Sequence, residues 1–136
     1  MWVDNTVPFG VYLADKSGAH SRYHPQDWSQ HKCREYLMNA SRDDPNDKLN
    51  RLRTIYNNFQ PAMHYFFLEK FPDPKSWVSH RVAYTRSVAV NSIVGYILGI
   101  GDRHTHNILL DTQSAEVIHI DFGIVFDQGK GLGTPG

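Results

Sequence analysis

Apolar residues recur at helical spacing in four stretches of the chain, and polar or proline-containing breaks separate these stretches. The pattern predicts helices over residues 29–40, 48–58, 62–71 and 77–98. Ser29 stands where an N-cap is expected for the first helix, and Pro61 opens the third. Helix is therefore the main element that the sequence predicts.

The last of these helices differs from the others, because the half that follows Val88 is apolar nearly all round. Such a helix is typical of the centre of a helical lobe, where every side is covered. Asn91 and Gly95 interrupt the apolar run and Gly99 ends it, so the run is too short to cross a bilayer. We therefore expect a buried helix here and no contact with a membrane.

Two short apolar runs near the C-terminus predict strands. Residues 108–110 and 117–120 are rich in Ile, Leu and Val, and residues 111–114 between them have the composition of a turn. Together they predict a β-hairpin. Residues 1–28 alternate in polarity and contain turn residues, which predicts short extended pieces. The expected fold class is α+β, mainly α.

The overall composition limits the range of functions. The chain has 136 residues, about the size of one domain, and its 14 basic residues balance its 14 acidic ones. No net field therefore attracts nucleic acid or a membrane surface, and direct nucleic-acid binding is not expected. The single cysteine, Cys33, excludes an intrachain disulfide and suits a reducing compartment. The N-terminus also lacks the features of a secretory signal.

The chemistry is concentrated in one polar loop and one aspartate. Asp102, His104 and Asn107 lie between the apolar helix and the first strand of the hairpin, and Asp121 follows the second strand. A tight hairpin returns Asp121 close to Asn107. Phosphoryl transfer requires a carboxylate that orients the attacking hydroxyl and oxygen ligands for magnesium, and this loop offers both.

The spacing of these residues follows the protein-kinase signature. In that signature the catalytic Asp precedes a metal-binding Asn by five positions and D-F-G follows. Here Asp102 precedes Asn107 by five positions, and residues 121–123 spell D-F-G. The histidine, however, follows the Asp-Arg pair instead of preceding it. This order, D-R-H-x-x-N, resembles the phosphatidylinositol-3-kinase-like superfamily.

The resemblance extends well beyond the loop. The segments TVPFG, GAHSRYHP and NFQPAMHYFFLEKF, together with residues 83–130, are similar to the ataxia-telangiectasia mutated (Tel1) branch of the related large nuclear protein kinases. The similarity covers essentially all 136 residues. It implies that residues 1–136 are a partial kinase catalytic domain: the hinge and the C-terminal (large) lobe of a protein-kinase-like fold, as far as the middle of the activation segment. The small lobe is expected to be absent, and the hairpin is expected to carry the catalytic and metal-binding loops.

The resemblance also implies a role for each residue of the loop. Asp102 would orient the substrate hydroxyl, and His104 would stabilise charge on the transferring phosphoryl group. Asn107 and Asp121 would hold Mg²⁺, with Mn²⁺ as a possible substitute. Arg103 is expected to brace the loop and to take no part in the chemistry.

For the ATP adenine, the resemblance places Trp2 and Val3 at the hinge, and Leu109 and Ile120 in the apolar floor under the purine. An adenine site needs apolar walls and a few backbone polar groups, which agrees with these residue types.

Several expectations about the whole protein rest on the resemblance alone. The activity would be that of a Ser/Thr protein kinase that uses Mg-ATP, prefers Ser or Thr followed by Gln, and acts in DNA-damage signalling and telomere maintenance. The expected location is the nucleus, and the expected partners are protein substrates and the remainder of the kinase chain. The isolated chain is expected to be inactive.

Two other interpretations remain open at this point. One is a metallophosphoesterase-like hydrolase, because G-D-x-H occurs in such sites, and a related hypothesis is a zinc site at His104, His106 and His119. The other is a kinase-like lobe that serves as a scaffold without catalysis.

Overall fold

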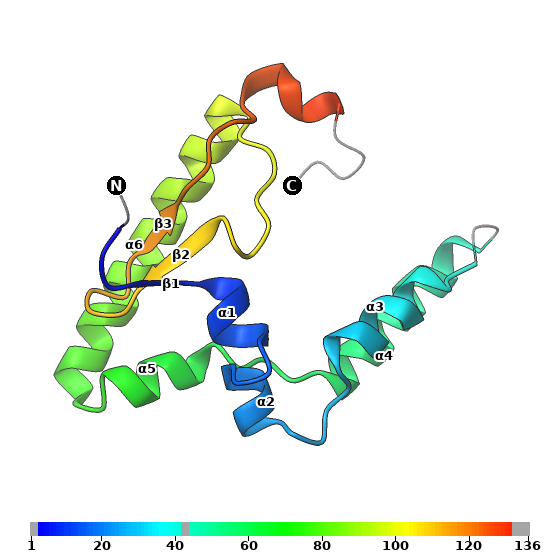
Figure 1. Ribbon diagram of the computed structural model, residues 1–136, viewed down its shortest axis with the longest axis horizontal. Helices are drawn as coiled ribbons and strands as arrows, with labels where there is room; N and C mark the ends of the chain where they lie inside the picture. Colours follow the sequence, from blue (N-terminus) through cyan, green and yellow to red (C-terminus); the bar gives the residue numbers. More distant parts are fainter. Residues whose placement is uncertain (1–2, 42–43, 132–136) are drawn as a thin grey trace.

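The computed structural model describes residues 3–41 and 44–131, which form mostly helices and one small sheet (Figure 1). In chain order the elements are β1 (Thr6–Pro8), α1 (Phe9–Ala14), α2 (Ala19–Tyr23), α3 (Gln30–Met38), α4 (Pro45–Asn58), α5 (His64–Lys70), α6 (Pro74–Leu98), β2 (Ile108–Asp111), β3 (Val117–His119) and a 3-10 helix (Phe126–Gly131). The fold class expected from the sequence, α+β and mainly α, is confirmed.

The sheet contains the expected hairpin and one further strand. Strands β2 and β3 are antiparallel, with Leu110 opposite Val117, and the N-terminal strand β1 adds to the other edge of β2 with Val7 opposite Leu110. The carboxylate of Asp111 closes the hairpin turn by accepting hydrogen bonds from the backbone N–H groups of Gln113 and Ser114. The hairpin therefore returns the chain toward the start of β2, as the sequence predicts.

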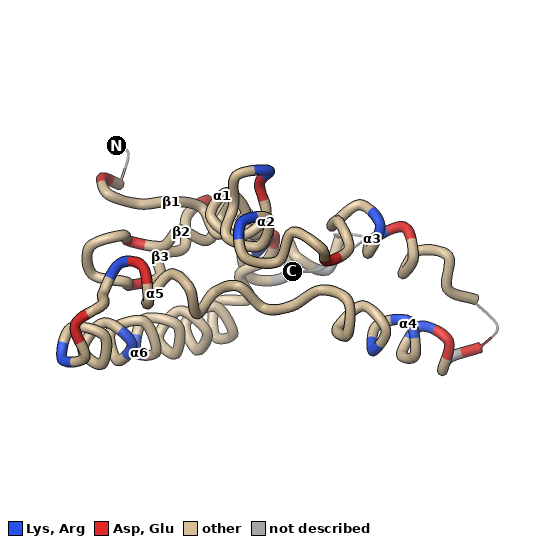
Figure 2. Tube along the Cα trace, turned by 90° about the horizontal axis from the view of Figure 1, so that it is seen from below, with Lys and Arg blue, Asp and Glu red and all other residues tan. Residues whose placement is uncertain are grey.

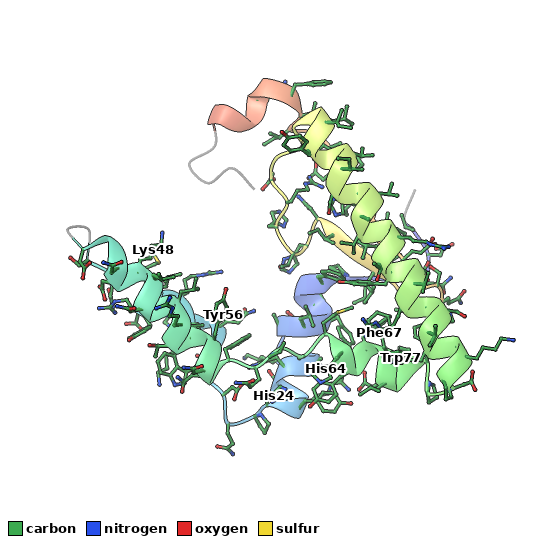
Figure 3. The ribbon with its side chains drawn as sticks, turned by 180° about the vertical axis from the view of Figure 1, so that it is seen from behind. His24, Lys48, Tyr56, His64, Phe67 and Trp77 are labelled. Atoms are coloured by element: carbon green, nitrogen blue, oxygen red, sulfur yellow. The ribbon has the colours of Figure 1, made fainter. Side chains whose placement is uncertain are left out.

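The core lies between one face of this sheet and the helices α5 and α6. Phe66 and Leu110 are completely buried, and the rings of Phe66 and Phe67 meet edge to face with centroids 5.3 Å apart. Phe67 and Trp77 lie where α5 meets α6 (Figure 3), and Trp77 packs against the core from the first turns of α6. The core thus fixes the hairpin against the long helix.

Polar side chains of α6 attach the helix to the edge of the sheet. Asn91 donates from Nδ2 to the carbonyl oxygen of Val117 (2.9 Å), and the Ser87 hydroxyl accepts from the Val117 N–H (2.8 Å). The N–H and the C=O of Val117, on the edge of the sheet, therefore both have hydrogen-bond partners. A buried backbone group without a partner would destabilise the fold. Asn91, which interrupts the apolar run in the sequence, therefore attaches α6 to the edge of the sheet.

The helix starts follow standard capping chemistry, and two lie earlier than the periodicity predicts. The Ser29 hydroxyl accepts from the Lys32 N–H (3.2 Å), as expected of an N-cap. Helix α6 begins at Pro74, because the carboxylate of Asp73 caps the N–H of Ser76 at 2.8 Å. Helix α4 begins at Pro45 in the same manner. Proline is tolerated at these first positions, where its missing N–H would have no partner anyway.

The prediction of extended pieces over residues 1–28 is wrong for most of that segment. Only Thr6–Pro8 forms a strand, and helices α1 and α2 follow. The apparent alternation from Phe9 to Leu13 conceals a helical period, since Phe9 and Tyr12, three residues apart, both pack against the core. The short run did not distinguish the two periods.

The prediction that the second half of α6 is buried all round is also wrong for the described residues. Its side chains are largely exposed, with Tyr96 at 85%, Ile97 at 69%, Val90 at 59% and Ile93 at 56%. The described elements contact this helix on the sheet side and leave the other side uncovered. A wide apolar face therefore remains on the outside of α6.

Helices α3 and α4 form a hairpin that projects away from the sheet and from α6 (Figure 1). Contacts at its base hold it, including the stacked rings of His20 and Phe59 (3.7 Å between centroids) and the bond from the Gln60 N–H to the Asp27 carboxylate (2.7 Å). Helices α3 and α4 carry both basic and acidic residues, whereas the charged residues of α6 are all basic (Figure 2). In residues 3–41 and 44–131, no helix combines the length and the apolar content that crossing a membrane requires.

Candidate active site

The loop between α6 and β2 is fixed at the point where it leaves the helix. Gly99 ends α6 in the left-handed region, at φ 57°. A Cβ at this position would lie 3.0 Å from the carbonyl oxygen of Phe126, so the segment after D-F-G crosses directly over the helix end. The N–H of Gly101 then bonds to the carbonyl oxygen of Ile124 at 3.0 Å. The close packing at Gly99 and the hydrogen bond of Gly101 therefore fix the start of the loop against the segment after D-F-G.

Asp102 and Asp121 both have left-handed backbone conformations, with φ of 56° and 58°. Such angles are uncommon for residues other than glycine and cost about 1–3 kcal/mol, so they persist only where the surroundings impose them. Residues held in this way are concentrated at functional sites. The two aspartates that the sequence singled out thus share an unusual local geometry.

Asn107 connects the loop to the hairpin through three hydrogen bonds. Its side chain donates from Nδ2 to the carbonyl oxygen of Asp102 (3.1 Å), and its own N–H donates to the carbonyl oxygen of His104 (2.9 Å). Its carbonyl oxygen accepts from the N–H of Ile120, at 3.0 Å. Asn107 is only 7% exposed, and its amide oxygen Oδ1 has no hydrogen-bond partner among the described residues. This oxygen therefore remains available to a ligand.

Arg103 joins the loop to the residues at the start of D-F-G. Its guanidinium donates to the carbonyl oxygens of Gly101 (2.9 Å), Ile120 (2.6 Å) and Asp121. The group also lies over the ring of Phe122, 5.5 Å from the centroid. A planar fork with several fixed donors suits this task, and the bracing role expected of Arg103 agrees with the geometry.

His104 and His106 lie on the exposed side of the loop. The backbone N–H of His106 donates to Nδ1 of His104 at 3.2 Å. Because Nδ1 accepts this bond, the proton of the neutral His104 ring is on Nε2, which leaves Nε2 as a free donor.

The charges at the site favour a cationic ligand. The carboxylates of Asp102 and Asp121 form no salt bridge within the described part of the chain, and no hydrogen bond satisfies the carboxylate oxygens there.

His119 on β3 is in a different environment, since its burial, and then the charge of Arg103, lower its pKa. This histidine is therefore mostly neutral near pH 7.

The oxygen atoms available at this site suit magnesium. Mg²⁺ prefers hard oxygen ligands, takes one or two from the protein and keeps phosphate oxygens and waters for the rest. The free Oδ1 of Asn107 and the exposed carboxylate of Asp121 match this requirement. Within residues 3–41 and 44–131, no three His, Cys, Asp or Glu side chains converge as the ligands of a zinc or two-metal centre would.

The residues expected around adenine are only partly brought together. Leu109 is buried, and it shares a sheet face with Ile120 because it lies opposite Ile118 in the register. This face is the one turned away from the core. Val3 is 43% exposed and precedes the turn that leads into β1, while Trp2 lies outside the described residues.

One residue in contact with the loop was not predicted from the sequence. Gly10 of α1 donates its N–H to the carbonyl oxygen of Thr105 at 2.9 Å. The sequence shows at this point only a glycine within an apolar run, a pattern that also occurs in strands and turns far from any site.

Comparison with known proteins links this geometry to one family. Residues 2–135 match the sequence profile of phosphatidylinositol 3- and 4-kinase. The chain is 52% identical over 136 residues to serine/threonine-protein kinase ATM of Drosophila melanogaster, and 43% identical over 134 residues to serine/threonine-protein kinase tel1 of Schizosaccharomyces pombe. The matched region is 98% of this chain but 5% of each relative, so the chain spans a small part of these proteins.

A solved structure described as the FAT and kinase domain of CtTel1 has a similar fold. The TM-score is 0.87 at 43% sequence identity, and the match covers 98% of this chain and 9% of the other.

Proposed function

The chain belongs to the phosphatidylinositol 3- and 4-kinase family, and from this membership we propose that it forms the catalytic-loop part of a serine/threonine protein kinase. The observation that carries the proposal is the hydrogen-bonded unit of Asp102, Asn107 and Asp121, in which Asn107 and Arg103 join the two aspartates. Two free carboxylates and one free amide oxygen are the groups that phosphoryl transfer requires of a protein.

In this proposal, Asp102 orients the acceptor hydroxyl. Its carboxylate is free of a cation partner in the described residues and can accept the hydrogen bond of a substrate Ser or Thr. His104 presents Nε2–H to the charge that develops on the phosphoryl group. Asn107 and Asp121 hold Mg²⁺ or Mn²⁺, which neutralises charge on the ATP phosphates.

ATP binding in the complete protein involves the face of the sheet turned away from the core. Leu109 and Ile120 form the apolar floor under the adenine, and Trp2 and Val3 belong to the hinge beside it. The support for this part is the shared face of Leu109 and Ile120 and the resemblance to the family.

The whole protein is proposed to phosphorylate Ser or Thr followed by Gln, in DNA-damage signalling and telomere maintenance in the nucleus. Its partners are protein substrates and the remainder of the kinase chain. This part rests on the likeness to relatives named ATM and tel1.

The alternatives receive less support. A metallophosphoesterase needs several converging metal ligands, and the described residues contain no such group. A scaffold that has lost its catalysis would not need Asp102, Asn107 and Asp121, and all three are present in this chain.

The test uses the full-length kinase with Asp102→Asn or Asp121→Asn, and Asp15→Asn as the control on an exposed turn. We expect each site variant to lower kcat at least about 100-fold, because positioning and charge stabilisation supply most of the rate. Asp121→Asn should also raise the Mg²⁺ concentration that gives half-maximal rate, which Asp102→Asn should not. Full activity of Asp121→Asn at low Mg²⁺ would refute the proposal.

A further inference from the structure

Helix α1 contacts the candidate catalytic loop through Gly10, which is buried. Its N–H donates to the carbonyl oxygen of Thr105 at 2.9 Å, which ties the loop to the first turn of the helix. The contact joins a segment near the N-terminus to residues almost a hundred positions later.

Steric crowding, and not backbone conformation, explains why position 10 is a glycine. Gly10 lies in α1 with a helical backbone, which any residue can adopt. A Cβ here would lie 2.6 Å from Cε1 of His106 and 2.9 Å from Oγ1 of Thr105. Approaches this short force one of the two partners to move.

The partner that moves is the loop. Helix α1 is anchored in the core, because the ring of Tyr12 packs edge to face on Phe66 (5.4 Å between centroids) and its hydroxyl donates to Glu69 at 3.0 Å. Thr105 and His106, in contrast, are exposed and have free space on their outer side. A larger residue at position 10 would therefore push the side chains of Thr105 and His106 outward.

The displacement would reach His104. The His106 N–H is the donor to Nδ1 of His104, and this bond selects the tautomer and restrains the ring. The Thr105 carbonyl that accepts from Gly10 and this N–H belong to the same planar peptide unit. Crowding at position 10 that lengthens the first bond would tilt this unit, weaken the second bond and release the His104 imidazole from its orientation.

We propose that Gly10 is a positioning residue for phosphoryl transfer, which sets the place of Thr105 and His106 and, through them, the orientation of His104. The proposal rests on the proposed kinase function of the loop. Its role is indirect, since Gly10 has no group that reaches a substrate.

The experiment compares full-length kinases that carry Gly10→Ala or Gly95→Ala. Both glycines lie in helices, but a Cβ at Gly95 has no atom within 4 Å, which makes it a matched control. We expect Gly10→Ala to lower kcat about 10- to 100-fold, because small displacements of catalytic groups have effects of this size. The KM for ATP and the thermal unfolding temperature should stay close to those of the unsubstituted kinase and of the control.

A second pair of variants tests the contact itself. His106→Ala removes the ring that a Cβ at position 10 would meet, so Gly10→Ala should lower kcat several-fold less in that background than in the unsubstituted protein. Such coupling is not expected if Gly10→Ala acts by unfolding α1.

The outcomes separate the two proposals. An unsubstituted kinase without phosphotransfer would refute the proposed function and this inference together. An active kinase in which Gly10→Ala leaves kcat unchanged would refute only the inference. A parallel loss of kcat and thermal stability, equal with and without His106, would also refute it, because Gly10 would then serve the fold alone.

Discussion

Arg103 donates from its guanidinium to the carbonyl oxygen of Ile120 at 2.6 Å, so one side chain spans from the candidate catalytic loop to the residue before Asp121. The same group reaches the carbonyl oxygens of Gly101 and Asp121. The relative position of the two loops therefore depends on the hydrogen bonds of Arg103.

Arg103→Lys in the full-length kinase is expected to lower kcat about 10-fold or more. Lysine keeps the charge, but its three donors sit on one nitrogen and lack the width of the planar guanidinium, whose three nitrogens each reach a different carbonyl oxygen. The measurement is steady-state kinetics, with Arg34→Lys as the control for an arginine-to-lysine change at an exposed position of α3, away from the loop. Equal kcat in the two variants would show that the brace is dispensable.

Glu69 joins three helices, because its carboxylate accepts hydrogen bonds from Tyr12, Arg22 and Tyr23. Burial alone would raise the pKa of this carboxyl, but the hydrogen bonds outweigh it and hold the pKa below its usual value. Glu69→Gln is expected to reduce the free energy of unfolding by about 1–2 kcal/mol at neutral pH.

The pH dependence of Glu69 has a definite sign. A carboxyl whose pKa is lower in the folded than in the unfolded state stabilises the fold above the unfolded value, and this contribution disappears as the pH falls through the folded value. Urea unfolding at pH 7 and at acid pH should show a smaller acid-induced loss of stability for Glu69→Gln. Glu35→Gln, on the exposed side of α3, should keep the acid-induced loss of the unsubstituted chain, and an identical loss in Glu69→Gln would contradict the expectation.

The polar attachment between α6 and β3 can be tested at Ser87. Its hydroxyl accepts the Val117 N–H at 2.8 Å, so Ser87→Ala leaves this amide without a partner and is expected to cost about 1–3 kcal/mol. Hydrogen exchange at the Val117 amide should become faster. Ser79→Ala is the control, since among the described residues the Ser79 hydroxyl bonds only within its own helix, to the carbonyl oxygen of Lys75. Unchanged exchange at Val117 would show that the bond is not formed in solution.

The apolar outer side of α6 predicts the behaviour of the isolated chain. Val90, Ile93 and Ile97 are each more than half exposed, and an apolar patch of this kind promotes association. Light scattering of the 136-residue chain should show self-association that the double variant Ile93→Glu/Ile97→Glu reduces. In the full-length kinase, the same pair should lower the yield of folded protein, because we expect the remainder of the chain to cover this face. A monomeric unsubstituted chain would contradict the first expectation.

The elements with a long or well-marked period could be predicted from the sequence. The helix around Val88 and the hairpin of residues 108–120 follow from apolar spacing and turn composition, and the Ser29 cap follows from its residue type. The proximity of the candidate site residues could be predicted as well, because the hairpin brings Asp121 back beside the loop of Asp102 and Asn107. Their roles in the chemistry stay predictions.

Contacts between distant segments could not be predicted in the same way. Asn91 bonds to Val117, and Gly10 bonds to Thr105, across sequence separations that no local pattern records. The helical nature of α1 was also missed, because six residues hold too few repeats to separate a period of 3.6 from a period of two. The exposure of α6 depends on which elements surround it, which its own sequence does not specify.

The left-handed backbone at Asp102 and Asp121 restricts which replacements can serve as informative inactive controls. Asparagine tolerates this conformation better than alanine or any β-branched residue, so it removes the charge while it preserves the course of the chain. An alanine at either position would combine a chemical loss with a change in the shape of the loop. A natural protein with valine or isoleucine at either position would therefore have a different loop backbone. Its lack of activity need not then result from the missing carboxylate charge.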